Sequence, residues 1–256
     1  MDEKEMQKRS HRREKTCENL SFAAKEAFKR LRTNVVTRFP DGDNPGHVIG
    51  VTSSQPSEGK STVSINLVYS LAELGKRVLL VDADMRRSSI HSKLGFPKEP
   101  GLSNLMAGDN SINAVLRKYQ SSKGNVSFDV ITGGLLPSNP SEILNSKRME
   151  TFLKTLITAY DYVILDLPPV AVVTDAVAIS SQTDGMIFVM REGYCPRGLL
   201  ADCVTQLQEV KANILGFVVN GALEGVGKKY GYGKGYYGKG YYGNYGNYGN
   251  YGNYGS

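Results

Sequence analysis

The segment Ser54-Gln-Pro-Ser-Glu-Gly-Lys-Ser61 carries residue types suited to gripping a chain of phosphates. It lies between an apolar run, 47–52, and a helical pattern, 62–74. In such a turn the backbone N–H groups point inward and meet the positive end of the helix. We expect Lys60 to reach the β- and γ-phosphates of a nucleoside triphosphate, with the Ser61 hydroxyl on Mg²⁺. The candidate nucleotide-binding residues are Ser57, Glu58, Gly59, Lys60, Ser61 and Thr62.

The match to the phosphate-loop pattern Gly-x-x-x-x-Gly-Lys-Ser/Thr is incomplete, because Ser54 stands in place of the first glycine. The alternative reading is an ordinary strand-to-helix turn capped by a serine. The preceding strand and the following helix are the context that the phosphate loop requires, and they favour the first reading.

Three carboxylates follow two other apolar runs. Asp82 and Asp84 come directly after 78–81, and Asp166 comes after 162–165. Ligands bind at the carboxyl ends of parallel strands, so we expect these carboxylates to converge with Lys60 and Ser61 at one edge of a sheet. Alone, each aspartate fits a helix cap or a turn equally well. Arg86 fits a phosphate clamp and a surface arginine about equally well.

Apolar runs and helical patterns alternate along the chain, which predicts an α/β fold of the P-loop NTPase type. Its sheet is expected to be mainly parallel, with helices on both faces. We expect strands at 47–52, 77–82, 127–131, 161–166, 185–190 and 214–220. We expect helices at 62–74, 141–159, 174–182 and 197–211, another beginning at Ser21, and short helices within 86–120.

Composition divides the chain into three parts: a mobile charged arm (1–18), a nucleotide-binding domain (19–224) and a disordered Gly/Tyr-rich tail (225–256). The tail holds four lysines and no acid, so most of the net charge of +6 belongs to it. The basic balance therefore does not imply nucleic-acid binding. No apolar run reaches the ~18 residues of a membrane span. We expect a cytoplasmic protein that reaches the membrane only through a partner.

The tail supplies candidate phosphate acceptors. A phenol with an ordinary pKa near 10 is protonated at neutral pH, and phosphoryl transfer needs positioning and charge neutralisation more than a strong base. The alternative is a solvating low-complexity segment. The candidate acceptors are Tyr230, Tyr232, Tyr236, Tyr237, Tyr241, Tyr242, Tyr245, Tyr248, Tyr251 and Tyr254.

Taken together, these motifs resemble the bacterial tyrosine kinases of the kind encoded with capsule and exopolysaccharide genes. The resemblance covers about 19–224 and the character of the tail. It rests on the phosphate loop, on Asp82-Ala-Asp84-Met-Arg86, and on Asp166-Leu-Pro-Pro169 with Thr174-Asp175-Ala176. Asn139-Pro-Ser-Glu142 and Arg32-Thr-Asn34 match further family segments.

The resemblance implies ATP and Mg²⁺ as substrate and cofactor. Lys60 would act on the phosphates, Ser61, Asp84 and Asp166 would surround Mg²⁺, and Asp82 would be the base toward tyrosine. Beside Lys60 and Asp82, we count Arg86 as a candidate catalytic residue, in the role of a phosphate clamp. It also implies autophosphorylation of the tail, in rings whose subunits present tails to one another. In addition, it implies a separate transmembrane activator with a cytoplasmic segment, a cognate tyrosine phosphatase and control of polysaccharide synthesis.

The residues of the ring contact depart from the family's pattern at one position. Glu26, Lys29 and Arg32 occupy the place of the family's oligomer motif, whose middle residue is usually arginine. Lysine cannot make the planar two-point contact of arginine. A solvated helix face with pairs three and four residues apart is an equally good reading.

Two other functions fit parts of the sequence. The first is a non-kinase ATPase switch of the partition or septum-positioning type, but that class has an extra lysine early in the loop, where this chain has Gln55. The second is an RNA- or protein-binding module in which the tyrosines and lysines of the tail make the contacts.

Overall fold

The computed structural model describes residues 17–39 and 46–222. A boundary between two compact units falls after Asn220, and the fold described below belongs to the first unit. The predicted arm up to residue 16 lies outside the described residues. The predicted tail, with its ten candidate acceptor tyrosines, also lies outside them.

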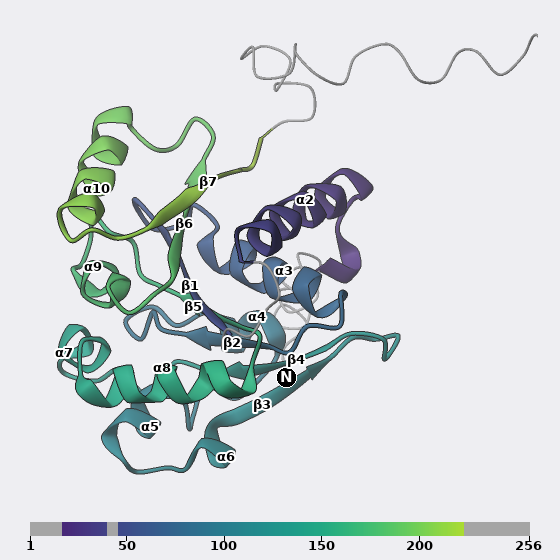
Figure 1. The fold of residues 1–256 in the computed structure, drawn as a ribbon, viewed down its shortest axis with the longest axis vertical. Coiled ribbons are helices and arrows are strands. Elements are labelled where there is room, and N and C mark those ends of the chain that lie inside the picture. The colour runs from purple at the N-terminus through teal and green to yellow at the C-terminus, as the bar shows by residue number, and fades with distance from the viewer. Residues whose placement is uncertain (1–16, 40–45, 223–256) are drawn as a thin grey trace, which may run out of the picture. The chain divides into compact units, whose positions relative to one another are not determined.

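The first unit is built around one seven-stranded sheet, in the order β3-β4-β2-β5-β1-β6-β7 (Figure 1). Every neighbouring pair is parallel except β3 and β4. This confirms the predicted α/β class and its mainly parallel sheet. The strands are β1 (His47–Ser53), β2 (Val78–Asp82), β3 (Leu116–Gln120), β4 (Ser127–Ile131), β5 (Tyr162–Asp166), β6 (Gly185–Arg191) and β7 (Ile214–Asn220).

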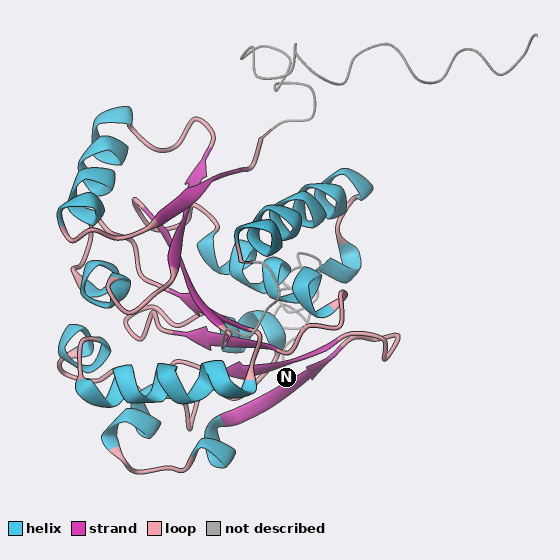
Figure 2. Ribbon diagram, in the orientation of Figure 1, coloured by secondary structure: helices cyan, strands magenta, loops and turns pink. Residues whose placement is uncertain are grey.

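Helices cover both faces of the sheet (Figure 2). The long helices α2 and α3 lie on one face, and α7 to α10 lie on the other. Among the described residues, no helix is both long enough and apolar enough to cross a bilayer. The helices are η1 (Cys17–Asn19), α2 (Phe22–Arg38), α3 (Lys60–Ala72), α4 (Ile90–Leu94), α5 (Leu102–Ala107), α6 (Ile112–Val115), α7 (Pro140–Leu144), α8 (Lys147–Ala159), α9 (Asp175–Ser180) and α10 (Arg197–Glu209).

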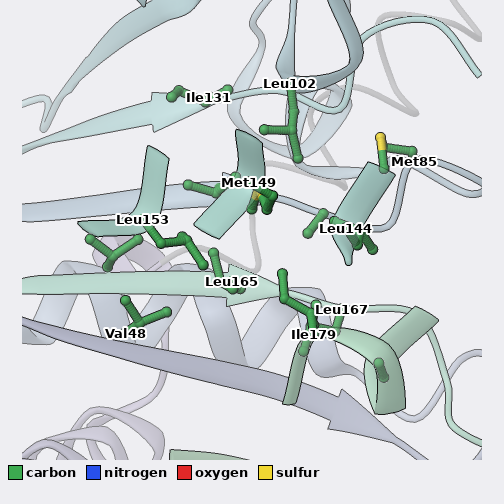
Figure 3. Close-up of a cluster of buried hydrophobic side chains, with 14 of the residues drawn as sticks. Val48, Met85, Leu102, Ile131, Leu144, Met149, Leu153, Leu165, Leu167 and Ile179 are labelled. Carbon is green, nitrogen blue, oxygen red and sulfur yellow. The ribbon is translucent and has the colours of Figure 1, made fainter. Parts of the chain in front are cut away.

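Two apolar clusters, one on each face, hold these layers together. In the larger cluster, Met149 and Leu153 of α8 pack over the sheet beside Leu165 of β5 and Val48 of β1 (Figure 3). The other cluster joins α2 and α3 to the opposite face of the same strands. Because β2 and β5 are covered on both faces, they are continuous apolar runs, which is why their positions were predictable.

The prediction of only short helices within 86–120 was wrong at its end, where β3 forms an edge strand antiparallel to β4. The side chains of β3 are only partly buried, and Arg117 and Lys118 interrupt its apolar character, so it lacks the signature of a central strand. The single helix predicted over 141–159 is two helices. The second begins at Lys147 and is capped by Ser146, whose hydroxyl accepts the Met149 N–H at 3.1 Å.

Strand register determines where the polar residues gather. β5 lies between β1 and β2, and all three run parallel. Asp82, the last residue of β2, is the direct register partner of Asp166, the last residue of β5. Val51 of β1 pairs with Asp166 from the other side, which brings the loop after β1 to the same edge.

We expect Leu153→Ala to lower the free energy of unfolding by about 2–5 kcal/mol, because it leaves a cavity under α8 where the side chain is almost fully buried. The exposed neighbour Lys154→Ala is the matched control on the same helix and should change stability by less than about 0.5 kcal/mol. Urea unfolding measures both values. Equal losses in the two variants would contradict this account of the core.

Candidate active site

The loop between β1 and α3 has the backbone shape of a phosphate cradle. Gly59, the N-cap residue of α3, has φ 98°, a left-handed value that favours glycine. A Cβ at this position would lie 1.9 Å from Asn220 Nδ2, so no side chain would fit here either. Ser57 also has a positive φ, 69°. The loop therefore turns sharply before delivering Lys60 and Ser61 to the first turn of the helix.

Glu58 is buried inside this loop and shapes it. Its carboxylate accepts hydrogen bonds from the Ser54 hydroxyl at 2.7 Å and the Gln55 N–H at 2.9 Å. It also accepts the N–H of Arg191, at the end of β6, at 3.4 Å. Ser54 thus fills the place of the missing first glycine by closing the loop on Glu58. Glu58 was predicted as a nucleotide-binding residue, and its side chain is engaged within the loop.

Three contacts from residues after β6 hold the loop. The Asn220 side chain, at the end of β7, donates to the backbone carbonyl of Glu58 at 2.9 Å. The Cys195 thiol lies 2.8 Å from the Ser54 hydroxyl. The Gln55 side chain donates to the Tyr194 carbonyl at 3.0 Å, so the position that is lysine in the partition class is tied to the β6–α10 loop.

Lys60 meets the predicted carboxylates below the loop. Its ammonium is 2.7 Å from Asp84 Oδ2, and both side chains are largely buried. Burial alone would lower the pKa of Lys60, but the charges of Asp166 and Asp84 outweigh burial and raise it. Lys60 therefore stays protonated, which is the state that attracts phosphate oxygens.

Asp82 and Asp166 form a buried acidic pair beside Lys60. Asp82 Oδ2 accepts hydrogen bonds from the Ser88 hydroxyl and from the N–H groups of Ser89 and Ile90. Asp166 Oδ1 accepts from the Ser64 hydroxyl at 3.1 Å. The other oxygen of each carboxylate is buried and has no hydrogen-bond partner among the described residues.

The environment of this pair disfavours two negative charges. Burial, followed by the charge of Asp166, raises the pKa of Asp82 from 3.8 to about 7. Burial also raises the pKa of Asp166, against the attraction of Lys60. Unpartnered carboxylate oxygens beside an ammonium are suited to a bound cation and phosphate, which would satisfy both.

Ser61 and Thr62 begin α3 under the loop. The Ser61 hydroxyl is 3.0 Å from the Ser89 hydroxyl, which follows the second acidic motif. No three or more His, Cys, Asp or Glu side chains of the described residues form a metal cage. Mg²⁺ needs no such cage, because it usually keeps water and substrate phosphates as ligands beside one or two carboxylates. The residues present thus fit Mg²⁺ with a nucleotide.

Arg86 lies at the rim of this site in an ion pair. Its guanidinium donates to both oxygens of the fully buried Asp175, at 2.9 and 3.1 Å, and to Ser141. This contact joins the second acidic motif to the segment after the third. A two-point contact with a buried carboxylate orients the arginine strongly.

The residues of the predicted ring contact lie on α2, away from this site. Glu26 and Lys29 form an exposed ion pair at 2.7 Å. Arg32 instead turns toward α3, where it donates to the Ser70 carbonyl at 3.0 Å and lies 3.7 Å from Glu73. The three residues are therefore divided between an exposed pair and an intramolecular contact.

The sequence reading missed the residues that hold the acidic groups in place. Ser64, Ser88 and Ser89 bind the carboxylates or Ser61, and Asn220 binds the loop. A signal exists for two of them, because Ser88 and Ser89 follow the Asp-Ala-Asp motif directly. Asn220 is more than 150 residues from the loop in sequence, and only the pairing of β6 with β7 brings it there.

Comparisons with known proteins find chains of similar sequence and fold. A family model described as an AAA domain matches residues 46–217. The tyrosine-protein kinase YwqD of Bacillus subtilis is 32% identical over 207 residues, 81% of this chain and 85% of YwqD. The kinase domain of the Escherichia coli tyrosine kinase Etk is 32% identical, with a TM-score of 0.72 over 85% of this chain and 80% of that domain.

A longer relative is similar over the same region. The putative tyrosine-protein kinase EpsB of Ralstonia nicotianae is 38% identical over 211 residues, which are 82% of this chain. Those residues are 27% of EpsB, so this chain spans only about a quarter of that relative's length.

We expect the metal-free protein to lose stability as the pH rises through the titration of Asp82. Between pH 3.8 and about 7 the folded state keeps a proton that the unfolded state has released, so the free energy of unfolding falls across this window. Asp82→Asn should remove most of that fall and be more stable than wild type by on the order of 2 kcal/mol at about pH 8.

Urea unfolding in EDTA at about pH 5 and about pH 8 measures this difference. The exposed Asp109→Asn is the control and should follow wild type at both values. A wild-type protein that is more stable at the higher pH, with Asp82→Asn less stable, would contradict the account of the acidic pair.

Proposed function

The chain belongs to the family of bacterial tyrosine-protein kinases, and we propose that it transfers the γ-phosphoryl group of ATP to tyrosine hydroxyls. The observation that carries this proposal is the cluster of Lys60, Asp84, Asp82 and Asp166 under a phosphate-type loop. The sequence identity to YwqD and Etk supports a kinase rather than another ATPase of the same fold.

Each group of the cluster has a role in this reaction. Lys60 would leave Asp84 and contact the β- and γ-phosphates. Ser61, Asp84 and Asp166 would hold Mg²⁺. Mg²⁺ neutralises charge on the phosphates when it is bound. Loop amides beside Gly59 would hold the phosphate chain at the N-terminus of α3, and Ser57 and Thr62 flank it.

The transfer forms one bond and breaks another. The tyrosine oxygen bonds to the γ-phosphorus, the bond from that phosphorus to the β–γ bridging oxygen breaks, and ADP leaves. The phenol proton goes to Asp82, whose Oδ1 has no hydrogen-bond partner among the described residues. Asp82 is fully buried, so the turn of Ser88 to Ile90 that covers it must move for a phenol to arrive.

Arg86 has a positioning role in this proposal. Its contact with Asp175 ties the segment that carries Asp82 and Asp84 to the start of α9. Arg86 also lies within the acidic motif. A small rearrangement would let its guanidinium leave Asp175 and clamp a phosphate.

The acceptors we propose are the ten tyrosines of the tail, in a reaction between copies of the chain. In the tail these tyrosines are separated by Gly, Asn and Lys. The many glycines add little bulk beside each phenol as it enters an active site. A ring of subunits with contacts through Glu26, Lys29 and Arg32 would present one tail to the next active site. A membrane-bound activator, a cognate phosphatase, a cytoplasmic location and control of polysaccharide synthesis complete the proposal.

We expect phosphate on the tail tyrosines after incubation with Mg-ATP, in the presence of the activator's cytoplasmic segment. Lys60→Met should lower the rate by about a hundredfold or more, because the γ-phosphate loses its buried ammonium. Lys154→Met, an exposed change of the same type on α8, should not. Mass spectrometry of the tail measures the outcome. ATP hydrolysis without any phosphotyrosine would favour the switch-type ATPase instead.

We expect the exposed pair on α2 to contribute to self-association. Glu26→Ala with Lys29→Ala should lower the mass of the assembly, because both side chains are exposed and would exchange their ion pair for contacts with another copy. Lys154→Ala is the control. Light scattering after size-exclusion chromatography measures the mass. An unchanged mass in the double variant would assign the pair to a solvated helix face.

A further inference from the structure

A cavity lies away from the active site. It has a volume of about 360 Å³ and is enclosed by η1, α2, the end of α3 and the turn between β3 and β4. Pockets of this size accept small organic ligands or single side chains. Its lining is Glu18, Asn19, Lys25, Phe28, Lys29, Tyr69, Ser70, Glu73, Ser121, Ser122, Lys123 and Asn125.

The charge balance of this cavity is positive. Three ammonium groups line it, those of Lys25, Lys29 and Lys123. Of its two acids, Glu18 already accepts hydrogen bonds from the Tyr119 hydroxyl at 2.7 Å and the Ser122 N–H at 3.1 Å. The other acid, Glu73, faces the guanidinium of Arg32. Lys29 is paired with Glu26 at 2.7 Å, and Lys25 donates to the Glu18 carbonyl at 3.2 Å. Both contacts are exposed and contribute little, so a bound anion would compete for these ammonium groups.

A buried polar atom of one lining residue, and one of a residue that contacts it, lack hydrogen-bond partners among the described residues. Ser70 is 2% exposed, and its hydroxyl has no hydrogen-bond partner among the described residues. Arg32 donates to the Ser70 carbonyl, and its buried Nε also has no hydrogen-bond partner among the described residues. Unpaired buried donors are costly, and each such group in a native fold needs an explanation. Only Ser70 of the two residues lines the cavity, so its hydroxyl is the donor that an oxygen-rich anion would use.

Two aromatic residues complete the lining. Phe28 of α2 and Tyr69 of α3 offer apolar surface beside the lysines. Inorganic phosphate would use the ammonium groups but leave this surface and most of the volume empty. A ligand with a flat apolar body and a dianionic end would use all of it.

We propose that this cavity binds an aryl phosphate, and specifically a phosphotyrosine side chain presented by a second copy of the chain. The aryl phosphate part rests on the lining alone. The choice of phosphotyrosine rests on the proposed function, which would produce it. The site is distinct from the active site, because Ser70 follows Lys60 by ten residues on α3, a rise of about 15 Å. A bound phosphotyrosine therefore leaves the phosphate loop open.

The test is calorimetric titration with a synthetic phosphopeptide, Gly-Asn-pTyr-Gly-Asn, which copies residues 243–247. The full chain carries Lys60→Met, so that the phosphate loop neither binds the probe well nor phosphorylates the tail. Because the probe is synthetic, its binding does not depend on kinase activity, and failure of the kinase proposal would leave this result intact.

We expect the phosphopeptide to bind, and its unphosphorylated form and inorganic phosphate to bind at least about tenfold more weakly. Lys29→Gln with Lys123→Gln should weaken binding by at least about tenfold through loss of two charged contacts, and Ser70→Ala should weaken it further. Lys154→Gln should change nothing.

Three results would overturn the proposal. No binding at millimolar phosphopeptide would remove the site. Equal binding of the phosphorylated and unphosphorylated peptides would remove the phosphate from recognition. Equal binding by the double lysine variant and its Lys154→Gln control would place the probe elsewhere, and circular dichroism would show that each variant is folded.

Discussion

The site depends on one electrostatic constraint, in which three buried carboxylates share a single buried ammonium. Asp82 and Asp166 are register partners on adjacent strands, so the sheet itself forces their charges together. Lys60 neutralises only part of this negative charge, because its closest contact is with Asp84. Such an arrangement is not needed for stability, since replacing buried charges with well-packed apolar groups is often neutral or stabilising. The strain is understandable if a cation and phosphates relieve it during function.

The phosphate loop meets this charge because other elements prevent it from relaxing. Glu58 gathers Ser54 and Gln55 from within the loop, while the Asn220 side chain holds the Glu58 carbonyl from the end of β7. Gly59 fits between them because any side chain would strike Asn220. The loop is thus preorganised by contacts that cross the sheet from β1 to β7, and binding a triphosphate would require little ordering of the backbone.

The central strands and the converging motifs were predictable, because burial on both faces and the edge rule for parallel sheets act on short sequence segments. The predictions reached Lys60, Asp82, Asp84 and Asp166 for that reason. They did not reach β3, whose half-exposed residues carry no such signal. Nor did they reach the Arg86–Asp175 contact, because the two residues are 89 positions apart and their pairing depends on how α9 packs on the sheet.

Helix α3 runs from the acidic cluster to the contact with α2. Its first turn carries Lys60 and Ser61 at the acidic cluster, and its last turns and C-cap residue carry Ser70 and Glu73 against α2. Eleven of its thirteen residues are buried, so it is held as one rigid element between α2 and the sheet. A group bound beside Ser70 and a group bound beside Lys60 would therefore contact the same body. Because such a body moves as a unit or not at all, a ligand at one end affects the other only by shifting the whole helix against β1 and β5.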